Sequence, residues 1–360
     1  MNKIFYLFLS FALFYSCTET TIKKKLRVVC IGDSITQGKV SHDTITQLSY
    51  RYWLWEKLDS AGFDVDMVGS HKNFFKEDTA HLLPITHSRY TKKVFDRDHE
   101  SYYGITSKGI LKDTFYHDSI KYLPFAQRIN DPKKGYTPDV AFINIGSNDK
   151  RSDSAESVSN IKEIINILYQ KNPEVIIFLQ KLTTGWNAQI NHSIDSIVKD
   201  FKKEKPELKI ISVDMASGFI NNPKRPDAMT FDWAHPNESG QKYMADKLFK
   251  AFMSLGDTIA PTFNPEIKII RTDADSVVIS WTPATDNKWV AGYDIYLDGK
   301  KANWRYSEGE KQDRQCIALV PKTEYYLKKL KPNTGYKIII AAVDYANNQT
   351  LSQEKVFHTN

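Results

Sequence analysis

The feature that most constrains the fold is an alternation of short apolar runs with stretches of helical periodicity. Five runs of mostly apolar residues are typical of strands buried on both faces: residues 26–31, 65–68, 140–145, 175–179 and 210–213. Helical patterns lie between and after them, at residues 49–62 with Ser49 as the expected N-cap, 154–170 and 239–255. This alternation predicts a doubly wound α/β domain with a five-stranded parallel sheet over residues 26–256.

The alternation of strand and helix patterns ends at residues 257–264, a polar stretch with Pro261 that is typical of a linker. Residues 265–360 consist of short strand patterns with turns, which predicts an all-β domain. Trp281 and Tyr336 fit the core tryptophan and the tyrosine corner of a Greek-key sandwich. The segment resembles a fibronectin type III domain. Because the boundary is polar and marked by proline, we expect few contacts between the two domains.

Residues 1–17 carry the signs of an export signal. Lys3 precedes an apolar run from Ile4 to Tyr15, which is too short to span a bilayer. The run ends at Ser16 and Cys17. This ending resembles a bacterial lipoprotein signal and implies that Cys17 is lipidated. The alternative is a plain signal peptide with an incidental cysteine. Both interpretations predict export, with residues 18–25 as a charged linker.

Charge and cysteine content narrow the functional classes. The formal net charge of +6 is small for 360 residues, and no long Lys/Arg block with interleaved aromatic residues occurs. We therefore expect no nucleic-acid partner. Apart from Cys17, Cys30 lies in an apolar run of the first domain and Cys316 lies in the second domain. No disulfide is expected from this arrangement.

Residues that can perform chemistry follow two of the predicted strands and precede the last helix. The run RVVCIGDSITQG brings Ser34 to the carboxyl edge of the sheet, and VAFINIGSND brings Asn148 to the same edge. Open α/β sheets bind their ligands at this edge. In DWAHPN, Asp232 lies three residues before His235. A serine, a histidine, an aspartate and an asparagine amide are therefore expected to meet above one sheet.

These blocks, in this order, resemble the SGNH (GDSL-like) hydrolase family over residues 26–256. GDSITQG, GSND and DWAHPN match its first, third and last blocks, and the last block often reads Asp-Gly-Leu-His-Pro in the family. The second block is similar to FDRDHESYYGITSKGI, a stretch like that of the family's acetyl-esterases, which contains Gly104. Ser101 there replaces a usual glycine and Ile105 a usual tryptophan. The resemblance implies a flavodoxin-like, three-layer α/β/α hydrolase.

The resemblance also implies a role for each matched residue. Ser34 would be the nucleophile, His235 the base that accepts its proton, and Asp232 the group that orients the imidazole. The backbone N–H groups of Ser34 and Gly104 and the side-chain amide of Asn148 would form the oxyanion hole. Ester hydrolysis needs such a set, because a serine hydroxyl is a poor nucleophile without a base.

Three further residues are candidate substrate contacts, namely Asp33, Trp186 and Trp233. Asp33 is also expected, with Asp149, to cap a turn and hold its loop. Packing of Trp186 against the core is an equally good interpretation of that residue.

Residues 70–104 form a long polar segment, of a length that is typical of a functional or mobile loop, and we expect it to cover part of the cleft. The segment contains His71, His81, His87 and His99. Their spacing fits no metal motif. We interpret these histidines as solvated loop residues and expect no metal and no cofactor.

Export, the sandwich domain and the second block together favour an exported serine esterase that removes O-acetyl groups from carbohydrate. The expected partner is an acetylated polysaccharide or glycan. Contact with a membrane is expected only through the lipid anchor of an outer-membrane lipoprotein, on its periplasmic or cell-surface side. A lipid esterase, lysophospholipase or thioesterase is a second hypothesis, which the lack of a long apolar loop disfavours. A non-catalytic glycan- or protein-binding lipoprotein is a third.

Overall fold

The computed structural model describes residues 25–39, 48–75, 84–88, 93–185, 188–302 and 322–360. The signal segment with Cys17, and also His81, Trp186 and Cys316, lie outside the described residues. None of the helices in the described part of the chain combines the length and apolar character needed to cross a bilayer.

The first domain is built on a parallel sheet. Its five main strands pair in the order β2-β1-β6-β7-β8, and all four pairings are parallel. These strands are β1 (Leu26–Gly32), β2 (Val65–Val68), β6 (Val140–Asn144), β7 (Ile176–Gln180) and β8 (Lys209–Val213). A short strand, β3 (Glu100–Ser101), also pairs with β1. The predicted parallel sheet is confirmed, and its strand order reverses between β1 and β6, where open α/β sheets bind ligands.

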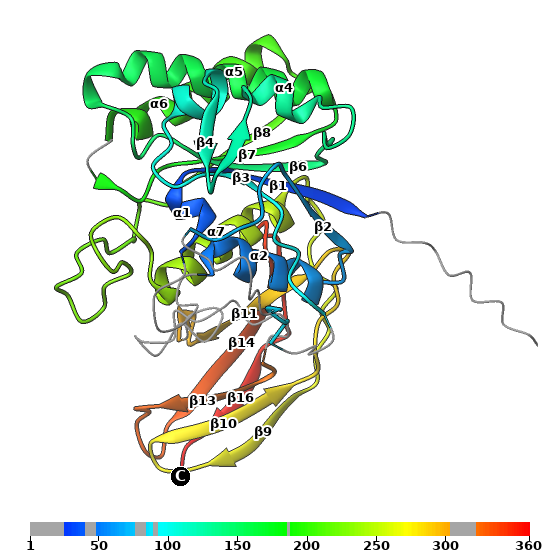
Figure 1. Ribbon diagram of the computed structural model, residues 1–360. Coiled ribbons are helices and arrows are strands. Elements are labelled where there is room, and N and C mark those ends of the chain that lie inside the picture. The colour runs from blue at the N-terminus through cyan, green and yellow to red at the C-terminus, as the bar shows by residue number, and fades with distance from the viewer. Residues whose placement is uncertain (1–24, 40–47, 76–83, 89–92, 186–187, 303–321) are drawn as a thin grey trace, which may run out of the picture.

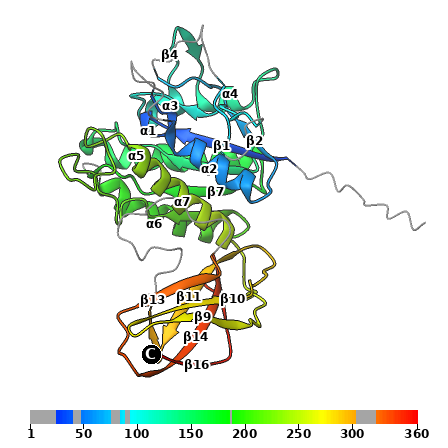
Figure 2. The same cartoon turned by 90° about the horizontal axis from the view of Figure 1, so that it is seen from below.

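Helices cover both faces of this sheet (Figure 1). One face carries α3 (Ser107–Lys112), α4 (Phe125–Ile129), α5 (Ser154–Lys171) and α6 (Ala188–Glu204), and the other carries α2 (Ser49–Ser60) and α7 (Glu238–Ser254). The remaining elements are α1 (Ser34–Gln37), a 3₁₀ turn (Arg151–Asp153) and the hairpin of β4 (Phe115–His117) and β5 (Ile120–Tyr122). In Figure 2 the hairpin lies at the end of this domain far from the sandwich.

The apolar runs fold as strands because both of their faces are buried. Along β1, Val29 and Ile31 belong to the core under α5 and α6. The alternate residues Val28 and Cys30 belong to the core under α2 and α7. Cys30 is fully buried, as a small apolar residue would be.

One detail of the helix prediction is wrong. Leu48 is the N-cap of α2, and Ser49 is its first residue, with a φ of 64°. The Ser49 hydroxyl donates to the Thr36 carbonyl oxygen at 2.6 Å. This hydroxyl therefore ties α2 to the short helix α1, which begins at Ser34.

The second domain is a sandwich of two antiparallel sheets. One sheet contains β9 (Ile267–Thr272), β10 (Ser276–Trp281) and β13 (Glu324–Lys328). The other contains β11 (Val290–Leu297), β12 (Lys300–Lys301), β14 (Gly335–Asp344), β15 (Gln349–Leu351) and β16 (Lys355–His358). Trp281 lies in the core between them. The Tyr336 hydroxyl accepts from the Lys331 N–H at 2.7 Å, which confirms the tyrosine corner.

The two domains meet through a small apolar contact, which the polar linker sequence does not reveal. In Figure 1 the sandwich lies on the α2 and α7 side of the sheet. Ala291 and Tyr345 of the sandwich belong to the same buried cluster as Phe249 of α7. The Tyr345 and Phe249 rings meet edge to face, with centroids 5.5 Å apart. The sequence of the linker could not predict this contact, because the apolar residues that form the contact lie outside the linker.

Tyr345→Ala is expected to destabilise the full chain by about 3–5 kcal/mol, because it removes an almost fully buried aromatic ring from the interface. Tyr345 is 2% exposed. Urea unfolding monitored by circular dichroism measures the loss. Tyr116→Ala is the matched control, since Tyr116 is 72% exposed and its removal should change stability by less than about 0.5 kcal/mol. Equal effects of the two substitutions would contradict a packed interface.

Candidate active site

The turn after β1 presents Ser34 at the carboxyl edge of the sheet. Asp33 is the N-cap of α1, and its Oδ1 accepts from the Ile35 N–H at 3.0 Å. Gly32 is needed because α1 folds back over the strand. A Cβ atom on Gly32 would lie 2.3 Å from Thr36 Oγ1 and 2.4 Å from the Asn144 carbonyl oxygen. Ser34 is therefore the first residue of a short helix held tightly against the strand end.

A second turn, before α7, brings His235 to Ser34. The His235 Nε2 atom lies 2.9 Å from Ser34 Oγ, and Nδ1 lies 2.8 Å from Asp232 Oδ2. The Asp232 Oδ1 atom also accepts from the His235 N–H at 2.8 Å. Burial alone would raise the pKa of Asp232, but the hydrogen bonds from His235 lower it below its ordinary value. An ionised Asp232 favours the tautomer with the proton on Nδ1, which leaves Nε2 free to accept from the Ser34 hydroxyl.

Aromatic rings hold the imidazole from the side. The Tyr103 ring is nearly parallel to the His235 ring, at 10° and with centroids 5.5 Å apart. Phe75 stacks on Tyr103 at 3.8 Å. Burial and the negative charge of Asp232 raise the pKa of Tyr103, so its ring stays neutral beside the histidine. Sequence reasoning missed Tyr103, although it is the residue before Gly104.

Backbone and amide donors lie beside Ser34. Gly104 has a φ of 77° and no atom within 4 Å of the position of a Cβ, so a glycine suits this open turn. The Asn148 amide donates to the Ile105 carbonyl oxygen at 3.0 Å, which places it next to Gly104. Among the residues that the structure describes, the N–H groups of Ser34 and Gly104 have no hydrogen-bond partner. Asp149 Oδ1 accepts from the Ser107 N–H at 2.8 Å and so holds this loop, as expected for Asp149.

Two family models match the chain. The model of the GDSL-like Lipase/Acylhydrolase family matches residues 28–248. The chain belongs to this family. The GDSL-like domain is followed by residues 260–357, which match the fibronectin type III domain. The protein is accordingly a carboxylic ester hydrolase with an appended sandwich domain.

Individual relatives are more distant. Over 92 residues, 26% of this chain, it is 32% identical to an alpha-amylase of Niallia circulans, of whose length the match spans only 6%. A family 3 carbohydrate esterase of Clostridium thermocellum has a similar fold, with 24% identity, a TM-score of 0.45, and coverage of 63% of this chain and 94% of that one. An acetyl esterase mutant with acetate ion gives 23% identity and a TM-score of 0.44, covering 64% and 97% of the two chains.

The two candidate substrate contacts of the GDSL-like domain that the structure describes differ in their exposure to solvent. Asp33 is fully buried, so the expectation that it contacts the substrate is wrong. Its carboxylate holds the turn instead, and burial raises the pKa of Asp33 to about 6. Trp233 is 46% exposed and lies between Asp232 and His235 in the chain. Trp186 lies outside the described residues.

Arg51 of the GDSL-like domain fixes the nucleophile turn from behind. It is fully buried and donates to the carbonyl oxygens of Thr36 at 2.8 Å, Gln37 at 3.0 Å and Arg97 at 2.9 Å. Burial lowers the pKa of Arg51 to about 10, so it stays charged at neutral pH. Sequence reasoning missed it, since nothing distinguishes Arg51 from the other charged residues of α2 before the fold is known.

The second block is anchored by a buried ion pair. Glu100 is fully buried, and its Oε1 accepts from Arg128 Nε and from the Tyr102 hydroxyl, both at 2.8 Å. Its Oε2 accepts from the Tyr136 hydroxyl, also at 2.8 Å. Oε2 also accepts from the Ser70 N–H at 3.2 Å and the Ser70 hydroxyl at 2.7 Å, so both carboxylate oxygens are hydrogen-bonded, as a buried carboxylate requires. Because Glu100 lies in β3, this network sets the position of the Tyr102–Gly104 turn.

Three of the four histidines of the long segment are buried, so their interpretation as solvated residues is wrong, and His81 lies outside the described residues. His71, His87 and His99 are all at most 4% exposed. Burial lowers the pKa of His71 to about 3 and that of His99 well below its ordinary range, so both are neutral. A polar segment gave no periodicity from which their burial could be predicted.

Gln37 links these histidines to the oxyanion turn. Its Oε1 accepts from the Tyr103 N–H at 2.6 Å. Its Nε2 donates to the Asn73 carbonyl oxygen at 3.0 Å and lies 3.1 Å from His71 Nε2. The amide orientation is thus fixed from both ends, and Gln37 holds the backbone that precedes Gly104. Gln37 lies inside the first block, but nothing in the sequence separates this role from that of its neighbours.

One group of side chains has ligand atoms within 4.8 Å of one another, as a metal site would: His71, His117 and Asp118. The Nε2 atoms of both histidines already face hydrogen-bond donors. His71 Nε2 accepts from the Gln37 amide, and the Tyr103 N–H lies 3.1 Å from His117 Nε2. This second contact puts the His117 proton on Nδ1, facing Asp118 Oδ2 at 3.4 Å. The donor set therefore suits a hydrogen-bond network better than a metal ion.

Proposed function

We propose that the protein is an exported serine esterase that removes O-acetyl groups from carbohydrate. The observation that carries this proposal is the continuous line of hydrogen bonds from Ser34 Oγ through His235 to Asp232. The Ser34 end of this line lies at the edge of the sheet where the Gly104 turn and the Asn148 amide meet. Nucleophilic acyl transfer needs this set of groups and no cofactor.

In the first half of the reaction, Ser34 Oγ attacks the acetyl carbonyl carbon while His235 Nε2 takes the hydroxyl proton. Negative charge that develops on the carbonyl oxygen is met by the N–H groups of Ser34 and Gly104 and by the Asn148 amide. Such donors act mainly in the transition state, where one contributes about 2.7–4 kcal/mol. Asp232 stabilises the imidazolium that forms.

The first half ends when the bond between the acetyl carbon and the sugar oxygen breaks, and the sugar oxygen takes the proton from His235. In the second half, the acetylated Ser34 is hydrolysed. A water molecule then attacks the acetyl carbon, with His235 Nε2 accepting its proton, and the same donors hold the oxyanion. Collapse of this intermediate releases acetate and returns the proton to Ser34.

Three features support acetylated carbohydrate as the substrate. Residues 95–110 are similar to the second block of acetyl-esterases within the family. The appended fibronectin type III domain is of a kind found on secreted carbohydrate enzymes. The N-terminal segment has the pattern of a lipoprotein signal, which supports an outer-membrane location with Cys17 as the anchor.

Acetate release from acetylated xylan, mannan, pectin and sialoglycan tests the proposal. We expect release from at least one of them, and no release by Ser34→Ala protein. A series of p-nitrophenyl esters from acetate to decanoate separates the acetyl esterase from a lipid esterase or thioesterase. We expect kcat/KM to be highest for acetate. A maximum at long acyl chains would contradict the proposal, and hydrolysis of none of these esters would favour a binding protein.

The export part of the proposal has its own test. Metabolic labelling with a radioactive fatty acid is expected to mark the full chain in the membrane fraction. Cys17→Ser is expected to abolish the label while leaving esterase activity in the cells. A labelled Cys17→Ser protein would contradict lipidation at this residue.

A further inference from the structure

Trp233 has a backbone conformation that tryptophan seldom adopts. Its φ of 72° lies in the left-handed region, where the Cβ of an L-residue crowds the backbone and only glycine escapes the penalty. Two hydrogen bonds hold the turn around Trp233. The Phe231 N–H donates to the His235 carbonyl oxygen at 2.9 Å, and Asp232 Oδ1 accepts from the Ala234 N–H at 3.3 Å. Such a turn needs a residue that tolerates positive φ, yet the chain places a large aromatic side chain there.

Packing within the protein does not explain this tryptophan. Trp233 is 46% exposed, and its indole makes no hydrogen bond and no ring contact within the described part of the chain. Phe231, two residues earlier, is exposed to the same extent. Strained residues persist mainly where function requires them, and adjacent exposed apolar rings are typical of a binding surface. Both rings lie on the turn that carries Asp232 and His235.

We propose that this turn also binds the sugar part of the substrate, through the exposed rings of Phe231 and Trp233. This inference rests on the proposed function. Sugar rings present apolar C–H faces that pack on aromatic rings, while their hydroxyl groups need polar partners. A binding surface on the turn of the catalytic histidine would place the acetylated hydroxyl near Ser34. The strain at Trp233 is then the cost of exposing an indole at this point.

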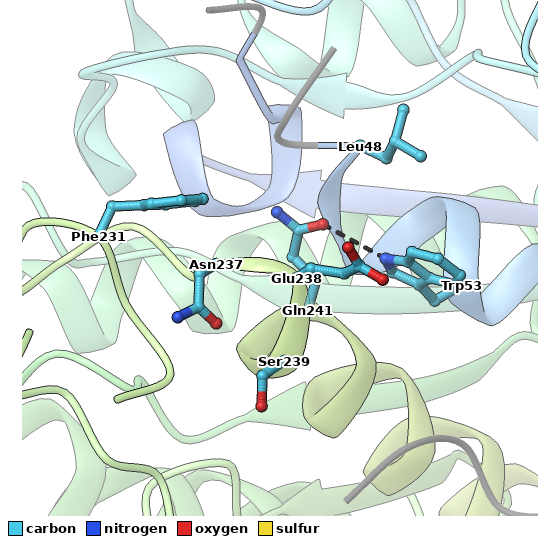
Figure 3. Close-up of a pocket in the computed structure, with 7 residues that line it drawn as sticks. All are labelled: Leu48, Trp53, Phe231, Asn237, Glu238, Ser239 and Gln241. Carbon is cyan, nitrogen blue, oxygen red and sulfur yellow. Dashed lines mark hydrogen bonds between the residues drawn. The ribbon is translucent and has the colours of Figure 1, made fainter. Parts of the chain in front are cut away.

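A cavity of about 510 Å³ adjoins the turn on the Phe231 side. Ligand sites in proteins have volumes of this order. Figure 3 shows Phe231 and Trp53 at opposite ends of the lining, with Asn237, Glu238 and Gln241 between them. Lys242 Nζ lies 4.4 Å from the centre of the Trp53 ring and covers one face. Phe231 is therefore the open aromatic wall, and the Glu238 carboxylate is a polar group suited to a sugar hydroxyl.

The test compares two substrates in wild type, Trp233→Ala and Phe231→Ala. For each protein, kcat/KM for acetylated oligosaccharides prepared from xylan, mannan and pectin is divided by kcat/KM for p-nitrophenyl acetate. The small ester has no sugar, so a lost sugar contact lowers the ratio. We expect each substitution to lower it by about tenfold or more. Lys329→Gly, at a residue of the sandwich with a φ of 60°, is the control that should leave the ratio unchanged.

Thermal unfolding tests the strain separately. Trp233→Gly and Trp233→Ala both remove the ring, but only glycine relieves the left-handed backbone. We expect Trp233→Gly to melt higher than Trp233→Ala by about 2 °C. A Trp233→Gly protein that melts no higher than Trp233→Ala would overturn the argument from strain.

The kinetic outcomes separate this inference from the proposed function. A wild type that releases acetate from the oligosaccharides, with the ratio unchanged in Trp233→Ala and in Phe231→Ala, would overturn the sugar-binding turn alone. A wild type that hydrolyses p-nitrophenyl acetate but releases no acetate from any oligosaccharide would overturn both. Lower ratios in the two variants, with Lys329→Gly unchanged, support both.

Discussion

Replacing Ser34 with alanine is expected to lower kcat/KM for p-nitrophenyl acetate by at least about 10⁴-fold, because no other group can form the acyl-enzyme. The protein should stay folded, since among the described residues the Ser34 hydroxyl makes one hydrogen bond, to His235, and the turn is held by Asp33, Gly32 and Arg51. Steady-state kinetics measures the loss, and circular dichroism with a melting curve confirms the fold. Folded Ser34→Ala protein with a rate near that of the wild type would contradict the assignment.

Substitutions of His235 and Asp232 are expected to lower activity to different degrees. His235→Ala should be nearly as severe as Ser34→Ala, and the double variant no worse than either, because the residues act as one unit. Asp232→Asn should lower kcat by less than about 10⁴-fold, which is the loss when a buried aspartate of such a set is replaced. The reason is that its side chain is 57% exposed, so water can replace part of its effect. A double variant whose loss is the product of the two single losses would show that Ser34 and His235 act independently.

Arg128→Met is expected to destabilise the protein by about 3–5 kcal/mol, because it leaves the Glu100 carboxylate buried without its cation. The Arg128 and Glu100 side chains are 4% and 0% exposed, with the charged atoms 2.8 Å apart. Burial alone would lower the pKa of Arg128, but Glu100 raises it, as a strong pair requires. Urea unfolding measures the change in the free energy of unfolding.

A matched surface pair serves as the control for this prediction. Arg271 and Asp273 lie 3.0 Å apart, with side chains 59% and 45% exposed. Arg271→Met should change stability by no more than about 1 kcal/mol, because exposed ion pairs contribute little. In the double variant Glu100→Gln/Arg128→Met, the loss should be smaller than the sum of the single losses. A loss from Arg128→Met as small as that from Arg271→Met would contradict a buried pair.

The parts of this protein that could be predicted are those with strong local patterns. The five strands follow from apolar runs, because a strand buried on both faces has few polar residues, as β1 and β6 show. Ser34 and Asn148 could be predicted because parallel strands bring their carboxyl ends to one edge. Asp232 and His235 could be predicted from the DWAHPN block before the last helix. The structure adds the hydrogen bonds between Ser34, His235 and Asp232.

The residues that support the site could not be predicted, because their partners are distant in the chain. Arg51 contacts the carbonyl oxygen of Arg97, and Glu100 contacts Arg128 and Tyr136. His71 and His99 lie in a polar segment, yet the fold buries them. The Tyr345 interface could not be predicted for the same reason, since Tyr345 and its partner Phe249 are distant in the chain.

The measurement that tests the account most directly is mass spectrometry of the protein after reaction with a fluorophosphonate, which phosphonylates an activated serine and releases fluoride. The account predicts one adduct, on the peptide that contains Ser34, and a loss of esterase activity in proportion to its formation. His235→Ala protein should react far more slowly. An adduct on another residue with complete loss of activity, or full activity with Ser34 modified, would contradict it.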